Sequence, residues 1–329
     1  MNHIGPVRIE TPRLTLRPFT ENDAQAMFDN WASDPEVTKF LTWPAHPSVE
    51  ITREILSLWA DRDSLTNYNW CIALKDTDEA IGSIAVVSID EDTETLEIGY
   101  CISRRFWGQG VVPEAAKALT DTLFKRVRPK RITAKHDVNN PNSGKVMRKI
   151  GMHLTETREA ENNTGICTVN VYAADRMDMH PLTDAHKREI CAWKYEGECA
   201  VYNLPPYEEM AARRAGFMNP DRAPNFHGFT ANGRLVGYVN ILEEPREIFI
   251  GVGVHPEFCN QGYGRRILDA AEEYCREHIP GKPLYLEVRT WNERAIRCYK
   301  RAGFEIVTEP YMKTTGAGKG TFYKMKRVI

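Results

Sequence analysis

Apolar residues recur along the chain at two spacings, every second residue as in strands and every three to four residues as in helices. The same order of these segments occurs twice. In the first half the period of two, with polar turns between the runs, predicts strands over 68–74, 80–89 and 95–102. A loop over 106–112 then precedes a helix whose apolar positions recur at helical spacing: Ala115, Ala116, Leu119, Leu123 and Phe124. A strand over 131–138 and a short helix that ends at Gly151 complete the predicted unit.

The second half repeats this order of elements. Strands are predicted over 235–242, 247–254 and 284–290, with a loop over 258–264 and two helices that end at Ile279 and Gly303. The polar stretch 176–187 between the halves is interpreted as a linker. We therefore expect two domains, residues 1–180 and 181–329.

An internal repeat supports this division. When the sequence is shifted by 152 residues, positions 98–151 align with 250–303 without a gap and share nine identities. Two of the shared pairs, Gly110/Gly262 and Asn140/Asn292, keep the same separation of 30 residues in both halves. The pattern predicts one α+β architecture used twice, each copy with a mixed, mainly antiparallel sheet flanked by helices.

Composition and charge exclude several classes of function. The 329 residues include 43 basic and 45 acidic side chains, and a net charge of −2 offers no basic field for nucleic acid. No apolar run is long enough for a membrane span, and the first ten residues do not resemble a secretory signal. The eight cysteines form no CxxC pair, so reduced thiols, no metal and a cytoplasmic location are expected.

The two glycine-bearing loops are the candidate ligand sites. Each joins a strand to a helix, where unpaired backbone N–H groups meet the positive end of the helix dipole and favour a phosphate. In the first loop these are the amides of Gln109, Gly110, Val111 and Val112. In the second loop the six residues Cys259, Asn260, Gln261, Gly262, Tyr263 and Gly264 are expected to hold a diphosphate.

Two other nucleotide motifs do not fit. A dinucleotide-binding fold requires GxGxxG directly after its first strand, and neither loop has that spacing. The run Gly316–Thr321 resembles a P-loop, but Lys313 stands at the position of its first glycine and Gly320 at that of its hydroxyl residue. This run is interpreted as a flexible hairpin tip, with Lys319 as a possible phosphate contact.

Several of these segments resemble the GCN5-related N-acetyltransferases (GNAT). The loop Gln261-Gly262-Tyr263-Gly264 is similar to their acyl-CoA loop, and Asn292-x-x-Ala295-x-x-x-Tyr299 followed by Gly303-Phe304 is similar to their closing motif. Segments 11–18, 34–41 and 107–110 resemble the RimJ/RimL branch, which includes protein N-terminal acetyltransferases. The sequence departs from the family pattern at three positions: Cys259, Val112 and Met147.

The resemblance implies acetyl-CoA as co-substrate and direct attack by a neutral amine on the thioester. It places main-chain N–H groups at Ile102 and Val254 as donors to the developing oxyanion. It makes Tyr299 the acid that protonates the leaving thiolate. Asn140 and Asn292 are expected to hold the pantetheine or its water, with helix N-capping as the alternative.

The same resemblance nominates Glu97 as a base that acts through water, and Glu247 as a weaker candidate. The acceptor is expected to be a small-molecule amine or a peptide N-terminus, bound near the aromatic segment 28–70 and Trp43. The C-terminal domain carries the better supported site. Because Met147 cannot donate a proton, the alternative is that the N-terminal domain binds acyl-CoA or a partner without catalysis. The oligomeric state is not determined by the sequence.

Overall fold

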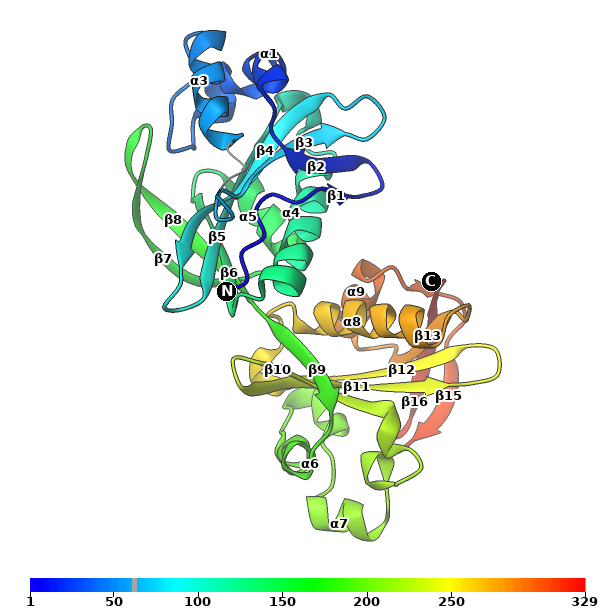
Figure 1. Ribbon diagram of the computed structural model, residues 1–329. Helices are drawn as coiled ribbons and strands as arrows, with labels where there is room; N and C mark the ends of the chain where they lie inside the picture. Colours follow the sequence, from blue (N-terminus) through cyan, green and yellow to red (C-terminus); the bar gives the residue numbers. More distant parts are fainter. Residues whose placement is uncertain (61–63, 329) are drawn as a thin grey trace. The chain divides into compact units, whose positions relative to one another are not determined.

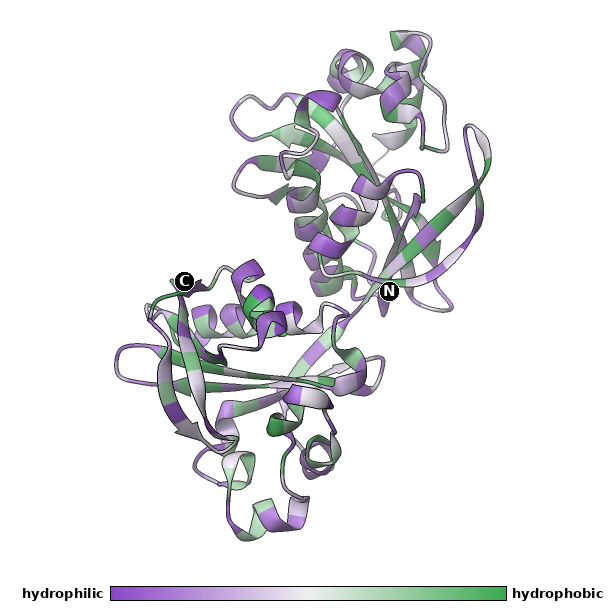
Figure 2. Ribbon diagram, turned by 180° about the vertical axis from the view of Figure 1, so that it is seen from behind, coloured by the Kyte–Doolittle hydropathy of each residue, from purple (hydrophilic) through white to green (hydrophobic). Residues whose placement is uncertain are grey.

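The computed structural model describes residues 1–60 and 64–328, which form two compact units. Unit 1 comprises Met1–Arg176 and unit 2 comprises Met177–Ile329. Each unit is built on one mixed sheet with helices on both faces (Figure 1). Figure 2 shows hydrophobic residues along the strands and hydrophilic residues on the outer helical turns. The two sheets confirm the α+β architecture predicted from the repeat.

The sheet of unit 1 has eight strands in the order β1-β2-β3-β4-β5-β6-β8-β7. Their bounds are β1 Ile9–Glu10, β2 Leu14–Pro18, β3 Asn69–Leu74, β4 Ala80–Asp90, β5 Thr95–Ile102, β6 Arg131–Asp137, β7 His153–Asn162 and β8 Gly165–Asp175. All neighbours pair antiparallel except β5 and β6, which run parallel. The three strands predicted before the first loop match β3, β4 and β5 to within a residue.

Two helical layers enclose this sheet. On one face α4 (Val111–Thr122) and α5 (Pro141–Lys149) pack against β5 and β6 around a core that includes Leu96, Ile98 and Leu119. The other face is covered by short helical segments: η1 Glu21–Asp23, α1 Ala24–Met27, η2 Phe28–Ala32, α2 Pro35–Thr38 and α3 Val49–Trp59. Pro113 lies in the first turn of α4, where its missing N–H leaves no helical bond unmade.

Unit 2 repeats the architecture with a sheet in the order β14-β16-β13-β12-β11-β10-β9, to which β15 adds beside β16. The strands are β9 Met177–Pro181, β10 Phe226–Ala231, β11 Arg234–Glu243, β12 Ile248–Val254, β13 Leu284–Arg289, β14 Glu305–Ile306, β15 Tyr311–Thr315 and β16 Gly318–Arg327. Helices α8 (Tyr263–His278) and α9 (Glu293–Arg301) cover one face. Helices α6 (Asp184–Ala192) and α7 (Tyr207–Ala212) cover part of the other.

The polarity of the stretch 176–187 suggested a linker, but this prediction is wrong. Residues Met177–Pro181 form β9, which pairs with β10 over its whole length, and α6 begins at Asp184 with Thr183 as its N-cap. Met177 and Met179 pack against the core of unit 2, while Asp178 and His180 alternate with them along the strand. An edge strand that is buried on one side carries polar residues on the other, so its sequence resembles that of a polar linker.

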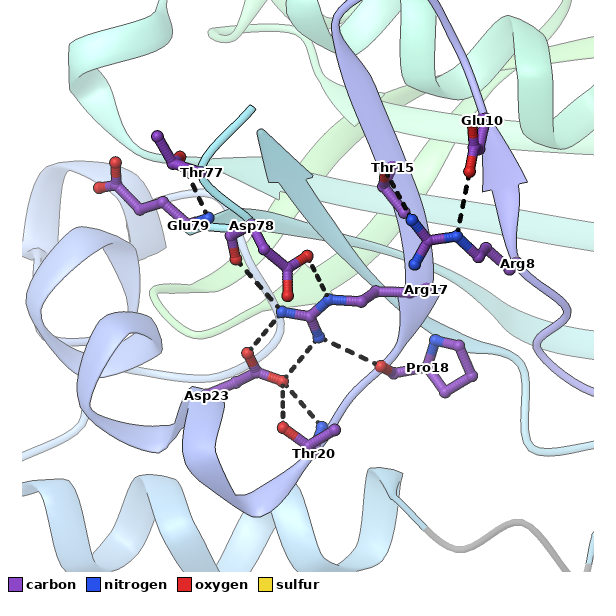
Figure 3. Close-up of polar contacts among 10 residues, drawn as sticks. All are labelled: Arg8, Glu10, Thr15, Arg17, Pro18, Thr20, Asp23, Thr77, Asp78 and Glu79. Carbon is purple, nitrogen blue, oxygen red and sulfur yellow. Dashed lines mark hydrogen bonds and ion pairs between the residues drawn. The ribbon is translucent and has the colours of Figure 1, made fainter. Parts of the chain in front are cut away.

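A buried ion pair fixes the start of unit 1. The Arg17 guanidinium donates two hydrogen bonds to Asp23, of 2.8 and 2.9 Å, and a third to Asp78 (Figure 3). The side chains of Arg17 and Asp23 are 12% and 8% exposed. Burial opposes ionisation of Asp23, but the hydrogen bonds from Arg17 and Thr20 outweigh it and lower the pKa of this carboxyl.

We expect Asp23→Asn to lower the free energy of unfolding by about 3 kcal/mol, because it leaves a buried guanidinium without its main counter-charge. Urea unfolding measures the change. Since the pKa of Asp23 is lowered in the fold, its stabilisation is present above the unfolded value and is lost as the pH falls below about 4. Asp78→Asn, at a carboxylate that is 64% exposed, is the control and should change stability by less than about 1 kcal/mol. Equal losses in both variants would contradict the assignment.

Candidate functional site

In each unit two parallel strands begin as partners and then separate. Strands β5 and β6 pair from Thr95↔Arg131 to Glu97↔Thr133, and β12 and β13 pair only at Ile248↔Leu284 and Phe249↔Tyr285. No register pair joins the remaining residues of these strands, all of which the structure describes. The strands therefore leave a wedge-shaped gap toward their carboxyl ends, where backbone groups lack a sheet partner.

The end of β5 directs an amide into this gap. Ser103 N donates to Ile81 O of β4 at 2.9 Å. Because successive residues of a strand direct their backbone groups to opposite sides, Ile102 turns its N–H and carbonyl toward the gap. The indole N–H of Trp107 donates to Ile102 O at 3.1 Å. The N–H of Ile102 is left facing the gap and stays the candidate oxyanion donor of unit 1.

Unit 2 has the same arrangement at the end of β12. His255 N donates to Val236 O at 3.0 Å, so Val254 faces the gap between β12 and β13. A different residue caps its carbonyl: the Tyr195 hydroxyl donates to Val254 O at 2.8 Å. Two unrelated side chains therefore occupy the strand-end carbonyls of the two units, and both leave the N–H toward the gap.

Each gap is followed by one of the two glycine loops. Gly110 and Gly262 are the N-caps of α4 and α8, with φ of 75° and 84°, a left-handed conformation that costs other residues about 1–2 kcal/mol. The preceding glutamine braces each loop in the same way. Gln109 Nε2 donates to Arg105 O at 2.6 Å, and Gln261 Nε2 donates to Glu257 O at 2.7 Å.

The residues after these glycines have buried side chains, so only their backbone N–H groups are available to a ligand. Val111 and Tyr263 are 4% and 3% exposed and belong to the cores, and Val112 packs against the core of unit 1. Their N–H groups belong to the first turn of a helix, where no helical carbonyl accepts them. The missing Cβ of Gly264 allows close packing, because a Cβ there would lie 3.3 Å from the Cys298 sulfur.

The start of the second loop differs from the family pattern in its chemistry. Cys259 directs its thiol toward the carbonyls of Val254 and His255, at 3.9 and 3.7 Å, so it adds no charge to the loop. Asn260 adopts a left-handed φ of 65°. Cys259 and Asn260 therefore add no charged side chain to this part of the loop.

An arginine that the sequence reasoning missed lies beside the first loop. Arg13 donates to Gln109 O at 3.2 Å and to the Glu114 carboxylate at 2.7 Å. Burial opposes ionisation of Glu114, but hydrogen bonds from Thr11 and Arg13 outweigh it and lower its pKa. Arg13 therefore balances an acidic residue in the first turn of α4, where an anionic ligand would otherwise be repelled.

Asn140 and Asn292 both cap helices, as the alternative interpretation stated. The Asn140 side chain accepts from Ser143 N at 3.4 Å, and the Asn292 side chain accepts from Ala295 N at 3.1 Å. Asn292 also donates to the Tyr202 hydroxyl at 3.3 Å. Its amide thus joins α9 to the segment that precedes α7.

The hydroxyl groups on the helices α5 and α9 differ between the units. Tyr299 on α9 packs against the core of unit 2, burial raises its pKa, and its hydroxyl has no hydrogen-bond partner within the described part of the chain. Met147, 152 positions earlier, is buried in unit 1. Ser143, which corresponds to Ala295, supplies a hydroxyl one helical turn away, and Tyr100 of β5 bonds to it at 3.0 Å. Burial raises the pKa of Tyr100 to about 12.

The two glutamates nominated as bases lie in different surroundings. Glu97 is the last residue of β5 that pairs with β6, so it lies where the strands separate, and Lys135 Nζ contacts its carboxylate at 2.9 Å. Glu247 lies one residue before β12, roughly 23 Å of extended chain from Val254, and is ion-paired with Lys324 and Lys326. The structure therefore does not place Glu247 at the gap.

An asparagine side chain from a hairpin holds residues 38–43 of the aromatic segment in unit 1, which we call the aromatic loop. Asn163, in the turn between β7 and β8, donates from its side chain to Thr38 O at 2.6 Å and to Trp43 O at 2.9 Å. Its backbone N–H donates to Leu41 O. The segment expected to bind the acceptor is thus fixed by a residue 120 positions away from Trp43, which no local pattern indicates.

The structure also bears on metals and membranes. Among residues 1–60 and 64–328, no three His, Cys, Asp or Glu side chains are grouped so that they could hold a metal ion. None of the helices in these residues is long and apolar enough to cross a bilayer.

Comparison with known proteins agrees with this geometry. Residues 13–153 match the acetyltransferase (GNAT) domain, and residues 181–304 match the acetyltransferase (GNAT) family. An uncharacterised N-acetyltransferase, p20 of Bacillus licheniformis, is 35% identical over 141 residues, which cover 43% of this chain and 79% of that protein. The chain belongs to the GNAT family. It is accordingly an acetyl-CoA-dependent acyltransferase with two GNAT domains in tandem.

Two further proteins are similar to parts of this chain. The N-alpha-acetyltransferase RimI of Mycobacterium tuberculosis is 34% identical over 122 residues, 34% of this chain and 73% of RimI. A GNAT-family acetyltransferase structure from Bacillus anthracis aligns with 52% of this chain and 99% of its own length, with 24% identity and a TM-score of 0.46.

The paired loops lead to a test of binding. We expect the chain to bind two equivalents of acetyl-CoA in calorimetry. Gln109→Glu and Gln261→Glu should each weaken one binding event at least about tenfold, because each variant replaces the loop brace with a negative charge at a helix N-terminus. Each variant is the matched control of the other. Loss of both events in either variant, or of neither, would contradict the assignment of one site to each loop.

Proposed function

We propose that unit 2 transfers the acetyl group of acetyl-CoA directly to a primary amine, either a peptide N-terminus or a small-molecule amine. The neutral amine attacks the thioester carbonyl carbon, the new C–N bond forms, and the C–S bond breaks. The observation that carries this proposal is the Tyr299 hydroxyl, which has no hydrogen-bond partner in the described residues. We infer that it reaches the gap between β12 and β13, because Tyr202, which bonds to Asn292 just after β13, acts on its pKa. The thiolate takes its proton from this hydroxyl, the amine releases its own proton to water, and the resulting tyrosinate regains a proton from water.

Burial supports the role of Tyr299 as a donor. Desolvation raises its pKa and so keeps the phenol protonated, which is the form that an acid must have. The N–H of Val254 faces the same gap and is the proposed donor to the oxyanion. The similarity to an N-alpha-acetyltransferase supports a peptide N-terminus as one acceptor class.

To isolate unit 2, the first kinetic test uses the full chain with Gln109→Glu. In this background Tyr299→Phe should lower kcat about 100-fold and leave acetyl-CoA affinity unchanged, because the phenol acts only as the thiolate leaves. Release of free CoA from a panel of amines and peptides gives the rate, and calorimetry gives the affinity. Tyr274→Phe on α8 is the control. An unchanged kcat would remove Tyr299 from the mechanism.

Unit 1 has a second possible mechanism and a non-catalytic alternative. The Ser143 hydroxyl, bonded to Tyr100, is the proposed proton donor in place of Met147, and Glu97 is the proposed base through water. Glu97 must then exchange its contact with Lys135 for that water. If neither residue acts, unit 1 is a module that binds acyl-CoA or a partner without turnover.

These alternatives are separated in the full chain with Gln261→Glu. We expect this chain to release CoA, and Ser143→Ala to lower its kcat about 100-fold without changing acetyl-CoA affinity. Asn142→Ala, on the same helix and bonded only to exposed Lys145, is the control. Binding of acetyl-CoA without any CoA release would instead favour the binding module.

A further inference from the structure

A short loop spans the open end of the gap in unit 2. We call residues 195–203 the bridging loop. The Asn203 side chain closes it by accepting from Tyr195 N at 2.7 Å and donating to Tyr195 O at 3.1 Å. One end is attached to β12 through Tyr195 and Val254, and the other end is attached to the start of α9 through Tyr202 and Asn292. The loop is thus fixed to both sides of the gap.

An arginine without a carboxylate partner faces this loop. Arg294 lies in the first turn of α9, is exposed, and has a guanidinium nitrogen 3.9 Å from the Cys199 sulfur of the bridging loop. Its charge acts on Tyr195, Tyr202 and Tyr299, so it lies within reach of the candidate acid. No carboxylate in the described residues lies within ion-pair distance of it.

Its neighbour on α9 behaves differently. Arg297 contacts Glu293 at 2.9 Å, four residues earlier on the same helix. Both arginines are exposed and belong to one helix, but only Arg294 is directed at the bridging loop. Arg297 therefore serves as a matched control for the charge of Arg294.

A second cation lies beside the same end of the gap. Arg289, the last residue of β13, is 5% exposed and donates to the carbonyls of Ala317, Gly318 and Lys319 in the β15–β16 turn. No described carboxylate pairs with it, and its Nε has no partner. A Cβ on Gly320 would lie 2.0 Å from a guanidinium nitrogen of Arg289, so the turn is shaped around this cation.

The carboxylate nearest to Arg289 along β13 is already paired with other groups. Glu287 shares its face of β13 with Arg289, and its two oxygens accept from Tyr311 at 2.6 Å and from Lys313 at 2.5 Å. The two guanidinium groups at the open end of the gap have no described carboxylate within ion-pair distance, and the acids of the bridging loop, Glu196 and Glu198, pair with neither of them. Such a surface is complementary to an anion.

Two anions could occupy it: a carboxylate on the acceptor, or the diphosphate of acetyl-CoA. The diphosphate position at the N-terminus of α8 already has two arginines in the first turn of that helix, Arg265 and Arg266. Arg294 contacts Cys199 of the bridging loop and also acts on Cys259 at the start of the second glycine loop, so it lies between the two loops, whereas Arg265 and Arg266 belong to the diphosphate position itself. This placement favours the acceptor.

Resting on the proposed function of unit 2, we propose that its acceptor carries a carboxylate close to the reacting amine and that Arg294 binds this carboxylate. Arg289 adds to the positive field but is held by backbone carbonyls. The same field disfavours the ammonium form of the amine, which is unreactive. Phe249 of unit 2 occupies the position equivalent to Glu97, the candidate base of unit 1. Unit 2 therefore has no carboxylate at that position to take the proton of an ammonium group.

The test uses the full chain with Gln109→Glu and two matched pairs of acceptors. One pair is hexapeptides that differ only by aspartate or asparagine at the second position, and the other is 4-aminobutyrate and its amide. We expect kcat/KM to favour the acidic member at least about tenfold, through KM. Arg294→Gln should bring the ratio close to one, and Arg297→Gln should keep it. Acetyl-CoA affinity, measured by calorimetry, should not change in either variant.

Each other outcome is decisive. Equal kcat/KM for the members of both pairs, or a preference that survives Arg294→Gln, overturns the proposal. Weaker acetyl-CoA binding in Arg294→Gln also overturns it and assigns Arg294 to the diphosphate. If no acceptor releases CoA while acetyl-CoA still binds, the transferase function of unit 2 fails, and this inference fails with it.

Discussion

The separation of two parallel strands is the constraint on which the rest of each unit depends. Strands β5 and β6, and likewise β12 and β13, pair at their first residues and then leave backbone groups without a sheet partner. Unpaired backbone groups are costly unless water or a ligand satisfies them. In the proposed function acetyl-CoA enters this opening, so the unpaired backbone groups supply its binding site. The helices α4 and α8 begin where each opening ends, and their free amides continue it.

The two units use different side chains at equivalent positions around the gap. The carbonyl at the end of the strand is capped by Trp107 in unit 1 and by Tyr195 in unit 2. The helix after the gap carries Ser143 and Met147 in one unit and Ala295 and Tyr299 in the other. A helical turn rises about 5.4 Å, so the candidate hydroxyls lie at different depths along the two helices. The backbone has been kept while the chemistry at the gap has diverged.

Much of the fold was predictable because it depends on local signals. Alternating residues gave β3, β4 and β5 to within a residue, and left-handed glycines marked the starts of α4 and α8. The linker prediction was wrong because β9 is an edge strand with one polar side. Neither Arg13, the bridging loop nor the contacts of Asn163 could be predicted, since each joins residues that are far apart in sequence. The roles of Glu97 and Tyr299 remain predictions, because the structure gives their surroundings rather than their reactions.

The turn between β7 and β8 determines the shape of the aromatic loop in unit 1. Asn163 reaches Thr38, Leu41 and Trp43 only because the hairpin extends the sheet by a fixed number of residue pairs. The length of the hairpin thus determines whether Asn163 can reach these carbonyls. Insertion of two residues into each strand of this hairpin would move the turn by about 7 Å, beyond the reach of a hydrogen bond. A change of hairpin length at the edge of the sheet can therefore reshape residues 38–43 without any substitution within that segment.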